Sequence, residues 1–178
     1  MRIVGGKFRH RNILMTNLET TRETQDKVRE AIYNMIGPYF DGGICLDLFA
    51  GSGAMGIEAF SRGIEEIHLN DLNAKALDIC RINCKSLNIS EVQFFNMDYK
   101  YFIKNCSYKY DLIILDPPYK LNNITEILSE ILLLIKIGGI VVFEMAKDSK
   151  YPSELDSLKL IKDKVYGIKR VVIYRSQL

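Results

Sequence analysis

Asp47-Leu48-Phe49-Ala50-Gly51-Ser52-Gly53 is the stretch of sequence that decides the fold. It ends an apolar run over residues 44–49, which only Asp47 interrupts, and it leads into a helical pattern over residues 55–61. Ligands of open α/β sheets bind at the carboxyl ends of such strands. Glycine lets the backbone approach a ligand, because no Cβ stands in the way. The stretch therefore predicts a ligand site at the end of a buried strand.

The chemistry of that ligand follows from what the stretch contains and what it lacks. Its glycines do not fit GxGxxG, since Met55-Gly56 breaks the spacing, and GK[ST] is absent. A P-loop is therefore excluded, and a dinucleotide-dependent oxidoreductase is disfavoured. An acid at the strand end is poor for a pyrophosphate and suits a ligand that presents amino, hydroxyl or cationic groups. S-adenosylmethionine carries a sulfonium, an ammonium and a ribose diol.

Strands and helices alternate along residues 39–178. We expect helices at 55–61, 74–86, 99–105 and 124–135, and strands at 44–49, 66–70, 92–95, 110–115, 140–144, 158–164 and 170–174. This alternation predicts an α/β fold with a doubly wound, seven-stranded, mostly parallel sheet of the Rossmann-like type. The connection between the last two strands is too short for a parallel crossover, so we expect the final strand to run antiparallel.

Residues 1–38 have a different pattern, which predicts an N-terminal extension packed on a catalytic domain formed by residues 39–178. Short strand-like runs at 2–4 and 12–15 flank a Gly5-Gly6 turn signal. Thr24 is a candidate N-cap for a helix that Gly37-Pro38 ends.

The charge of the chain is concentrated in this extension. The net charge is +2, but residues 1–36 hold seven basic and four acidic residues (+3), and the remainder holds 17 basic and 18 acidic residues (−1). A concentrated basic patch is typical of a surface that binds phosphates, although a solvated arm that binds nothing has the same composition. The candidate phosphate-binding residues of this segment are Arg2, Lys7, Arg9, Arg11, Arg22 and Arg29.

Composition excludes several other classes of protein. The apolar runs in this chain of 178 residues are too short to span a bilayer, and its N-terminus has no apolar signal core. We therefore expect a cytoplasmic protein of one main domain, and nothing suggests more than a monomer. Cys80 and Cys84 lie one helical turn apart, but four metal ligands do not gather, so we expect reduced thiols and no metal.

Two further acids follow expected strands and complete a candidate cofactor site. Asp71 lies 24 residues after Asp47 and can accept both hydroxyls of a ribose, while Asp98 can accept an adenine amino group. Each acid alone also suits a helix cap or a turn, but three at successive strand ends favour a shared ligand. The expected cofactor-binding residues are Asp47, Phe49, Ala50, Gly51, Gly53, Asp71, Leu72, Asp98 and Tyr99.

Asp116-Pro117-Pro118-Tyr119 follows the apolar strand at 110–115 and indicates methylation of an amino group. The exocyclic amine of a base is a poor nucleophile, because its lone pair is conjugated with the ring. Asp116 and the Pro117 carbonyl can each accept one N–H, which orients that lone pair, and the two prolines fix the backbone. Tyr119 can stack on a base that has been flipped out of its helix. A rigid turn without catalytic function is the alternative.

The order DLFAGSG, ND, MD and DPPY resembles the class I, Rossmann-like S-adenosylmethionine methyltransferases of the amino-group type. Three stretches resemble the RsmD family in particular: RIVGG at residues 2–6, TRETQDKVREAIYN at residues 21–34, and Tyr166-Gly167 before the last expected strand. This resemblance implies methylation of a guanine N2 in 16S ribosomal RNA, within the small subunit or an assembly intermediate. It also implies that the N-terminal arm, with Arg2, Arg9, Arg11 and Arg22, helps to hold the RNA. We therefore expect the six basic residues named above to bind RNA.

The sequence departs from the family pattern at three positions. Glu23 stands where Pro is expected, Asp71 where Glu is more usual, and His10 where Gly is common. Glu23 affects how the helix begins, and Asp71 shortens the contact with the ribose by one methylene. His10 affects the turn of the basic arm.

Other functions stay open at this point. One is a DNA adenine-N6 methyltransferase, although 178 residues leave little room for a target-recognition region. Another is a non-catalytic RNA-binding assembly factor that keeps the fold. A protein-glutamine methyltransferase would more often present Asn in place of Asp116. Outside the arm the charge is weak, which suggests that partner proteins complete the binding surface.

Overall fold

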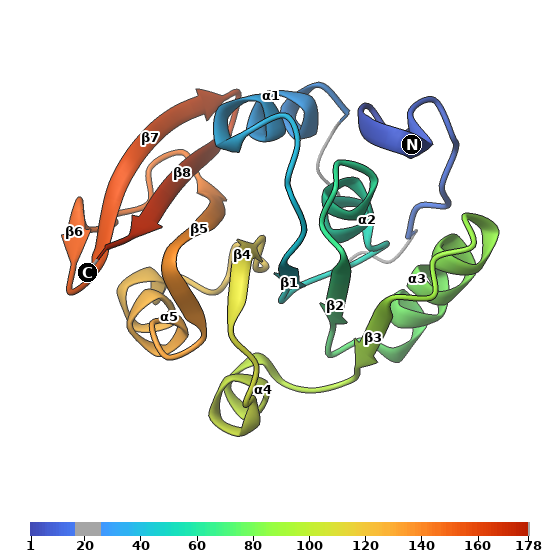
Figure 1. The fold of residues 1–178 in the computed structure, drawn as a ribbon. Helices are drawn as coiled ribbons and strands as arrows, with labels where there is room; N and C mark the ends of the chain where they lie inside the picture. The colour runs from blue at the N-terminus through green and yellow to red at the C-terminus, as the bar shows by residue number, and fades with distance from the viewer. Residues whose placement is uncertain (17–25, 178) are drawn as a thin grey trace.

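The computed structural model describes residues 1–16 and 26–177, and one eight-stranded sheet organises them (Figure 1). The strand order is β3-β2-β1-β4-β5-β8-β7-β6. Neighbours from β3 to β5 are parallel, while the pairs β5–β8, β8–β7 and β7–β6 are antiparallel. The elements are η1 (Gly6–Phe8), α1 (Asp26–Ile36), β1 (Ile44–Asp47), α2 (Ala54–Ser61), β2 (Glu66–Asn70), α3 (Ala74–Ser86), β3 (Val92–Phe95), α4 (Tyr99–Asn105), β4 (Tyr110–Leu115), α5 (Ile124–Ile131), β5 (Ile135–Ala146), β6 (Glu154–Leu155), β7 (Leu158–Tyr166) and β8 (Lys169–Ser176).

This architecture confirms the predicted doubly wound sheet, including the antiparallel final strand, which inserts between β5 and β7. The sheet has one strand more than predicted, because the two residues of β6 pair with β7. The prediction for residues 132–135 was wrong. Helix α5 ends at Ile131, and Ile135 already pairs with Tyr110 as the first residue of β5.

An irregularity in β5 conceals the beginning of this strand in the sequence. Tyr110 pairs with Ile135, but Leu112 pairs with Ile140, so β5 carries extra residues that include Gly138 and Gly139. Gly138 has φ +78°, and a Cβ on Gly139 would lie 2.8 Å from the Lys136 carbonyl oxygen. The glycines that indicated a turn therefore allow a bulge inside one long strand.

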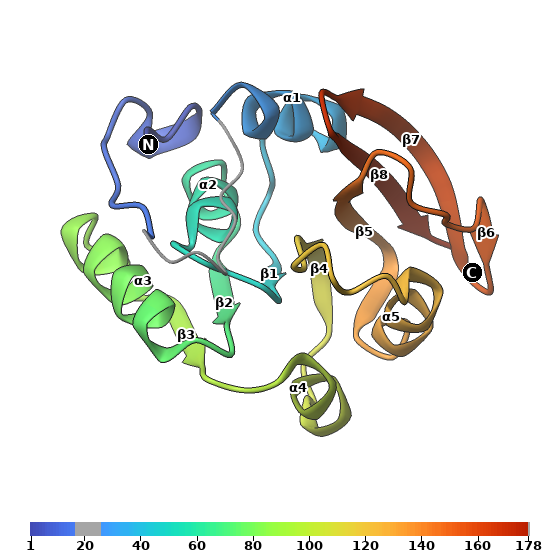
Figure 2. The ribbon, with the colours of Figure 1, turned by 180° about the vertical axis from the view of Figure 1, so that it is seen from behind.

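Two hydrophobic cores cover the two faces of the sheet. The N-terminal residues and helices α1, α2 and α3 lie on one face, and α4 and α5 lie on the other (Figures 1 and 2). Side chains alternate between the faces, so Leu112 and Ile114 of β4 belong to the first core, while Ile113 and Leu115 belong to the second. A strand covered on both faces needs apolar side chains throughout, which explains the continuous apolar runs.

The N-terminal arm is a compact turn rather than the predicted pair of strands. A single antiparallel bridge joins Arg2 to Asn12, and η1 lies between them. His10 has φ +71°, so it adopts the left-handed conformation that a glycine adopts most easily. The predicted N-cap Thr24 lies outside the described residues.

A buried ionic cluster centred on Glu58 of α2 fastens this arm. Glu58 Oε2 contacts Arg29 Nε at 3.3 Å, and Oε1 contacts Arg62 Nε at 2.8 Å. The Val4 N–H also donates to Glu58 Oε2, at 3.0 Å. Removing one member of a buried cluster leaves uncompensated charge, so the arm, α1 and α2 are coupled in stability.

Candidate active site

A pocket of about 680 Å³ opens at the carboxyl ends of β1, β2, β3 and β4. Three acids that the sequence placed after different strands, Asp71, Asp98 and Asp116, meet there. This is the edge at which open α/β sheets bind their ligands. The pocket is lined by Leu48, Phe49, Asn70, Asp71, Leu72, Asn73, Ala74, Met97, Asp98, Tyr99, Asp116, Pro118 and Leu121.

The glycine loop takes its shape from backbone contacts with the second strand. Gly51 and Gly53 have φ of +57° and +80°, which favour glycine. The Ala50 N–H donates to the Asn70 carbonyl at 2.9 Å, and the Gly51 N–H donates to Asp71 Oδ2 at 2.9 Å. Ala50, Gly51 and Gly53 therefore form the frame of the loop, while Leu48 and Phe49 face the pocket.

Asp47 lies behind this loop and is 2% exposed. Its Oδ2 accepts the Gly56 N–H at 3.0 Å, so it holds the first turn of α2. Burial raises the pKa of Asp47 to about 7, although the hydrogen bond from Gly56 acts in the opposite direction. Its position indicates support for the loop, whereas Asp71 and Asp98 line the pocket directly.

Asp71 and Asp98 each combine a structural contact with a position on the pocket. Asp71 accepts the Gly51 N–H through Oδ2 and the Asn73 N–H through Oδ1, at 2.9 and 2.8 Å. Asp98 is the N-cap of α4, and its Oδ1 accepts the Lys100 N–H at 2.9 Å. Asp98 can therefore cap α4 and face a ligand in the pocket at the same time. A carboxylate has about four acceptor positions, so each acid keeps some for a ligand.

Aromatic side chains form one wall of the pocket. The rings of Phe49 and Tyr99 are tilted by 47° with their centroids 5.4 Å apart. The Tyr99 hydroxyl accepts a hydrogen bond from Asn123 Nδ2 at 3.2 Å, which fixes the ring. Leu72 is exposed at the rim. These residues suit a planar ring that lies against the wall.

Asn70, the last residue of β2, is a pocket residue that was not predicted from the sequence. Its Nδ2 donates to the Leu48 carbonyl at 3.0 Å and to the Met97 carbonyl at 3.1 Å, so it ties three strand ends together. Its Oδ1 is buried and has no hydrogen-bond partner within residues 1–16 and 26–177. Its place directly before Asp71 at a strand end was the available signal.

Asp116 reaches the same pocket from the neighbouring strand. Leu115 of β4 pairs with Phe143 of β5, so Asp116 and Glu144 follow this last pair side by side at the edge of the sheet. Pro118 lines the pocket, Pro117 is buried and Tyr119 is half-buried. The Pro118 carbonyl accepts the Leu121 N–H at 2.9 Å, which closes a turn directly after the motif.

The predicted RNA-binding residues that the structure describes do not form one patch beside the pocket. The Lys7 ammonium lies 4.0 Å from the centroid of the Phe60 ring, near the end of α2 and at the edge of the sheet opposite the pocket. Arg11 donates to the Ser86 carbonyl at the end of α3, at 3.2 Å, and Arg9 is exposed. Arg2 is exposed beside Asp26 at the start of α1.

Arg29 requires a correction. Its side chain is fully buried and ion-paired with Glu58 and Asp26, so it is not available to an RNA phosphate on the surface. The sequence of α1 alone did not reveal that Glu58, a buried acid on α2, would neutralise Arg29. Arg22, which was also predicted to bind RNA, lies outside the described residues.

The acids and thiols that the structure describes do not gather into a metal site. Over residues 1–16 and 26–177, no group of three or more His, Cys, Asp or Glu side chains is placed to hold a metal ion. Cys45, Cys80 and Cys84 are buried thiols, and burial raises the pKa of each. The same described residues contain no helix with the length and apolar character needed to cross a membrane.

An open α/β sheet with acids at successive strand ends and Asp-Pro-Pro-Tyr after the fourth strand defines a class I methyltransferase. A family model described as conserved hypothetical protein 95 matches residues 1–175. The chain belongs to this family, the RsmD family of methyltransferases.

Known proteins resemble the chain over nearly its whole length. YlbH of Bacillus subtilis is 36% identical over 183 residues, which cover 99% of this chain and 100% of YlbH. Ribosomal RNA small subunit methyltransferase D of Haemophilus influenzae is 29% identical over 184 residues, 99% of this chain and 94% of that protein. The solved structure of yhhF from Escherichia coli covers 100% of this chain and 98% of its own, with a TM-score of 0.89 at 23% identity, and so supports the fold.

Proposed function

We propose that this protein transfers a methyl group from S-adenosylmethionine to the exocyclic N2 amine of a guanine in 16S ribosomal RNA. The observation that carries the proposal is the single pocket in which Asp71, Asp98 and Asp116 meet. Two of these acids suit a nucleoside cofactor, and the third stands where an acceptor amine would be oriented. Amino-group methylation needs both sites to share one edge of the sheet.

The residues of the pocket fit S-adenosylmethionine. Asp71 would accept the ribose hydroxyls, and Asp98 the adenine amino group, while Phe49 and Tyr99 offer apolar contact to the adenine ring. The buried Asn70 Oδ1 is an additional acceptor for a hydroxyl or amino group. A pocket of about 680 Å³ lies in the range of cofactor sites. When bound, the cofactor supplies an electrophilic methyl group on its sulfonium.

The chain's own residues would orient the acceptor amine. The Asp116 carboxylate and the Pro117 carbonyl each accept one N–H of the amine, so the nitrogen lone pair points into the pocket. Pro117 and Pro118 restrict the backbone, so the Pro117 carbonyl is already held in place when the amine binds. Tyr119 stacks on the flipped base and holds its plane. Orientation and proximity provide most of the rate acceleration, because the amine is a weak nucleophile.

Ribosomal RNA as the substrate is supported by the relatives. The Haemophilus influenzae protein, with 94% of its length matched, carries small-subunit ribosomal RNA in its name. We propose 16S RNA within the small subunit or an assembly intermediate as the acceptor, and a cytoplasmic monomer as the enzyme. We also propose residues 1–38 as an RNA-binding extension of a methyltransferase domain formed by residues 39–178.

The test is a methyl-transfer assay with labelled S-adenosylmethionine and small ribosomal subunits from cells that lack the protein. Digestion to nucleosides identifies the product, and Asp116→Ala runs beside the wild type. We expect label in N2-methylguanosine with the wild type and its loss with the variant.

The other outcomes separate the alternatives. Label in DNA adenine or in protein, with none in subunits, would overturn the substrate. Binding of S-adenosylmethionine without transfer to any of these acceptors would favour the non-catalytic assembly factor.

A further inference from the structure

One face of the β7–β8 hairpin carries a row of cations that the charge count of the sequence had concealed. In an antiparallel pair, side chains of directly opposed residues lie on the same face. Lys162 pairs with Ile173, and Lys164 pairs with Val171. Both apolar partners belong to the core beneath α1 and α2. The two lysines therefore project from this same face, which we call the basic face.

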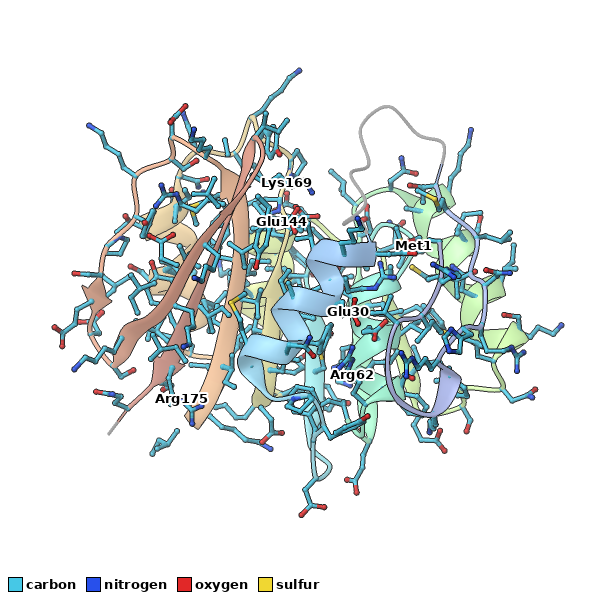
Figure 3. The ribbon with its side chains drawn as sticks, turned by 90° about the horizontal axis from the view of Figure 1, so that it is seen from above. Met1, Glu30, Arg62, Glu144, Lys169 and Arg175 are labelled. Carbon is cyan, nitrogen blue, oxygen red and sulfur yellow. The ribbon has the colours of Figure 1, made fainter. Side chains whose placement is uncertain are left out.

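The register extends the basic face along the whole hairpin. Tyr166 packs against the same core and pairs with Lys169. At the other end, Lys159 pairs with Arg175. Lys169 and Arg175 mark the two ends of β8 in Figure 3. The basic face is formed by Lys159, Lys162, Lys164, Lys169 and Arg175.

The charges on the two faces of the hairpin are arranged differently. On the opposite face, Arg170 Nη1 is neutralised by Asp163 at 2.8 Å. On the basic face, Lys162, Lys164 and Arg175 are exposed and form no ion pair with any described residue, whereas Lys159 lies directly opposite Glu154 of β6. Three cations without an ion pair on one exposed sheet face repel each other, so their arrangement favours a polyanionic partner over solvent alone.

The basic face leads to the active site at its Lys169 end. Lys169 contacts the buried Glu144 of β5, and Figure 3 shows the two side by side. Glu144 follows the last β4–β5 pair next to Asp116, which lines the pocket. A polyanion lying along the hairpin would therefore reach the edge of the sheet at which the acceptor amine must be placed.

The spacing of the lysines suits a nucleic-acid backbone. Lys162 and Lys164 are alternate residues of β7 and lie about 6.7 Å apart along the strand, which is similar to the separation of successive phosphates along a single nucleic-acid strand. Lysine binds phosphate as a point charge and does not read bases. The basic turn around Lys7 lies at the opposite edge of the sheet, away from the pocket.

We propose that the basic face of the β7–β8 hairpin binds the phosphate backbone of the ribosomal RNA and aligns the strand that carries the target guanine with the pocket. The proposal rests on the proposed function for the identity of the RNA. It assigns to the C-terminal hairpin a substrate-binding role in addition to that proposed for the N-terminal arm.

The test compares two double variants that remove the same charge. Lys162→Gln with Lys164→Gln neutralises the middle of the basic face. Lys85→Gln with Lys104→Gln removes two exposed lysines from α3 and α4 and serves as the control. Binding to protein-free 16S RNA and to small subunits is measured between about 50 and 200 mM salt. Urea midpoints confirm that both variants are folded, since exposed substitutions shift stability by about 0.5 kcal/mol or less.

The hairpin variant should bind RNA more weakly than the control, and its salt slope should fall by about 0.7 to 0.9 for each phosphate that it no longer neutralises. In the methyl-transfer assay KM for the RNA should rise more than kcat falls. Lys162→Glu with Lys164→Glu should weaken binding further. Equal affinity and equal salt slope in the hairpin and control variants would overturn the proposal.

Failure of the proposed function gives a different result. If the wild type forms no N2-methylguanosine, the substrate assignment fails, while the RNA affinities of the two double variants still decide the role of the basic face. Loss of binding to a small-subunit protein with unchanged RNA affinity would reject RNA as the occupant.

Discussion

The Gly51 N–H donates to Asp71 Oδ2 at 2.9 Å, so the glycine loop after β1 and the acid after β2 form one unit. The same carboxylate accepts the Asn73 N–H at 2.8 Å through its other oxygen. Both oxygens are therefore oriented before any ligand arrives. A preoriented acceptor loses less conformational freedom when it binds a ribose.

This relationship predicts the effect of Asp71→Asn. An amide has one acceptor oxygen, so its NH₂ group would face one of the two backbone N–H donors. We expect S-adenosylmethionine to bind at least about tenfold more weakly, equivalent to the loss of about 1.4 kcal/mol. Isothermal titration calorimetry measures the change, with urea unfolding to confirm the fold. Asp71→Glu keeps both acceptors and should weaken binding less; the reverse order of the two variants would contradict the assignment.

Substitution of Asp116 should separate chemistry from cofactor binding. We expect Asp116→Ala to lower kcat by about 100-fold or more, because one of the two acceptors that orient the amine is lost. Asp116→Asn keeps one acceptor oxygen at the same place and should lose less. The affinity for S-adenosylmethionine should stay near the wild-type value in both. A large loss of cofactor affinity with unchanged kcat would show that Asp116 binds the cofactor instead.

The buried cluster around Glu58 should contribute strongly to stability. Glu58→Gln leaves Arg62 buried without its anion and removes one of the two carboxylates that pair with the buried Arg29, which keeps its contact with Asp26. We expect the free energy of unfolding to fall by about 3 kcal/mol or more. Glu126→Gln breaks the exposed Lys100–Glu126 pair and is the matched control, with an expected loss below about 1 kcal/mol. Equal losses in urea unfolding would show that the cluster is no more important than a surface pair.

The strand ends were predictable because local and global signals agree there. The apolar runs bounded the parallel strands, and the acids after them lie at one edge of the sheet in any parallel arrangement. Asp71 and Asp98, which were expected to share a ligand with Asp47, line one pocket together with Asp116. Asp47 differs because it is still part of β1, as its last residue between β2 and β4, and its carboxylate is buried against the first turn of α2.

Contacts between distant segments account for the features that were not predicted. Residues 132–135 continue the apolar pattern of α5, and only pairing with β4 shows that Ile135 belongs to a strand. Arg29 has the composition of a surface cation, and only Glu58 on another helix makes its burial possible. The net charge of residues 37–178 is close to zero, so it gave no sign of the lysines of β7. Only the register of the strands shows that these lysines lie on one face.

Asp47 should make the stability of the protein depend on pH. Burial raises its pKa from the ordinary 3.8 to about 7, so between these values the folded state binds the proton more readily than the unfolded state. The contribution of Asp47 to the free energy of unfolding therefore falls as the pH rises through this window and levels off above about pH 7. Asp47→Asn keeps an oxygen for the Gly56 N–H and does not titrate. Urea unfolding across this range should show a smaller decline with pH in the variant, and parallel curves for the two proteins would contradict the assignment.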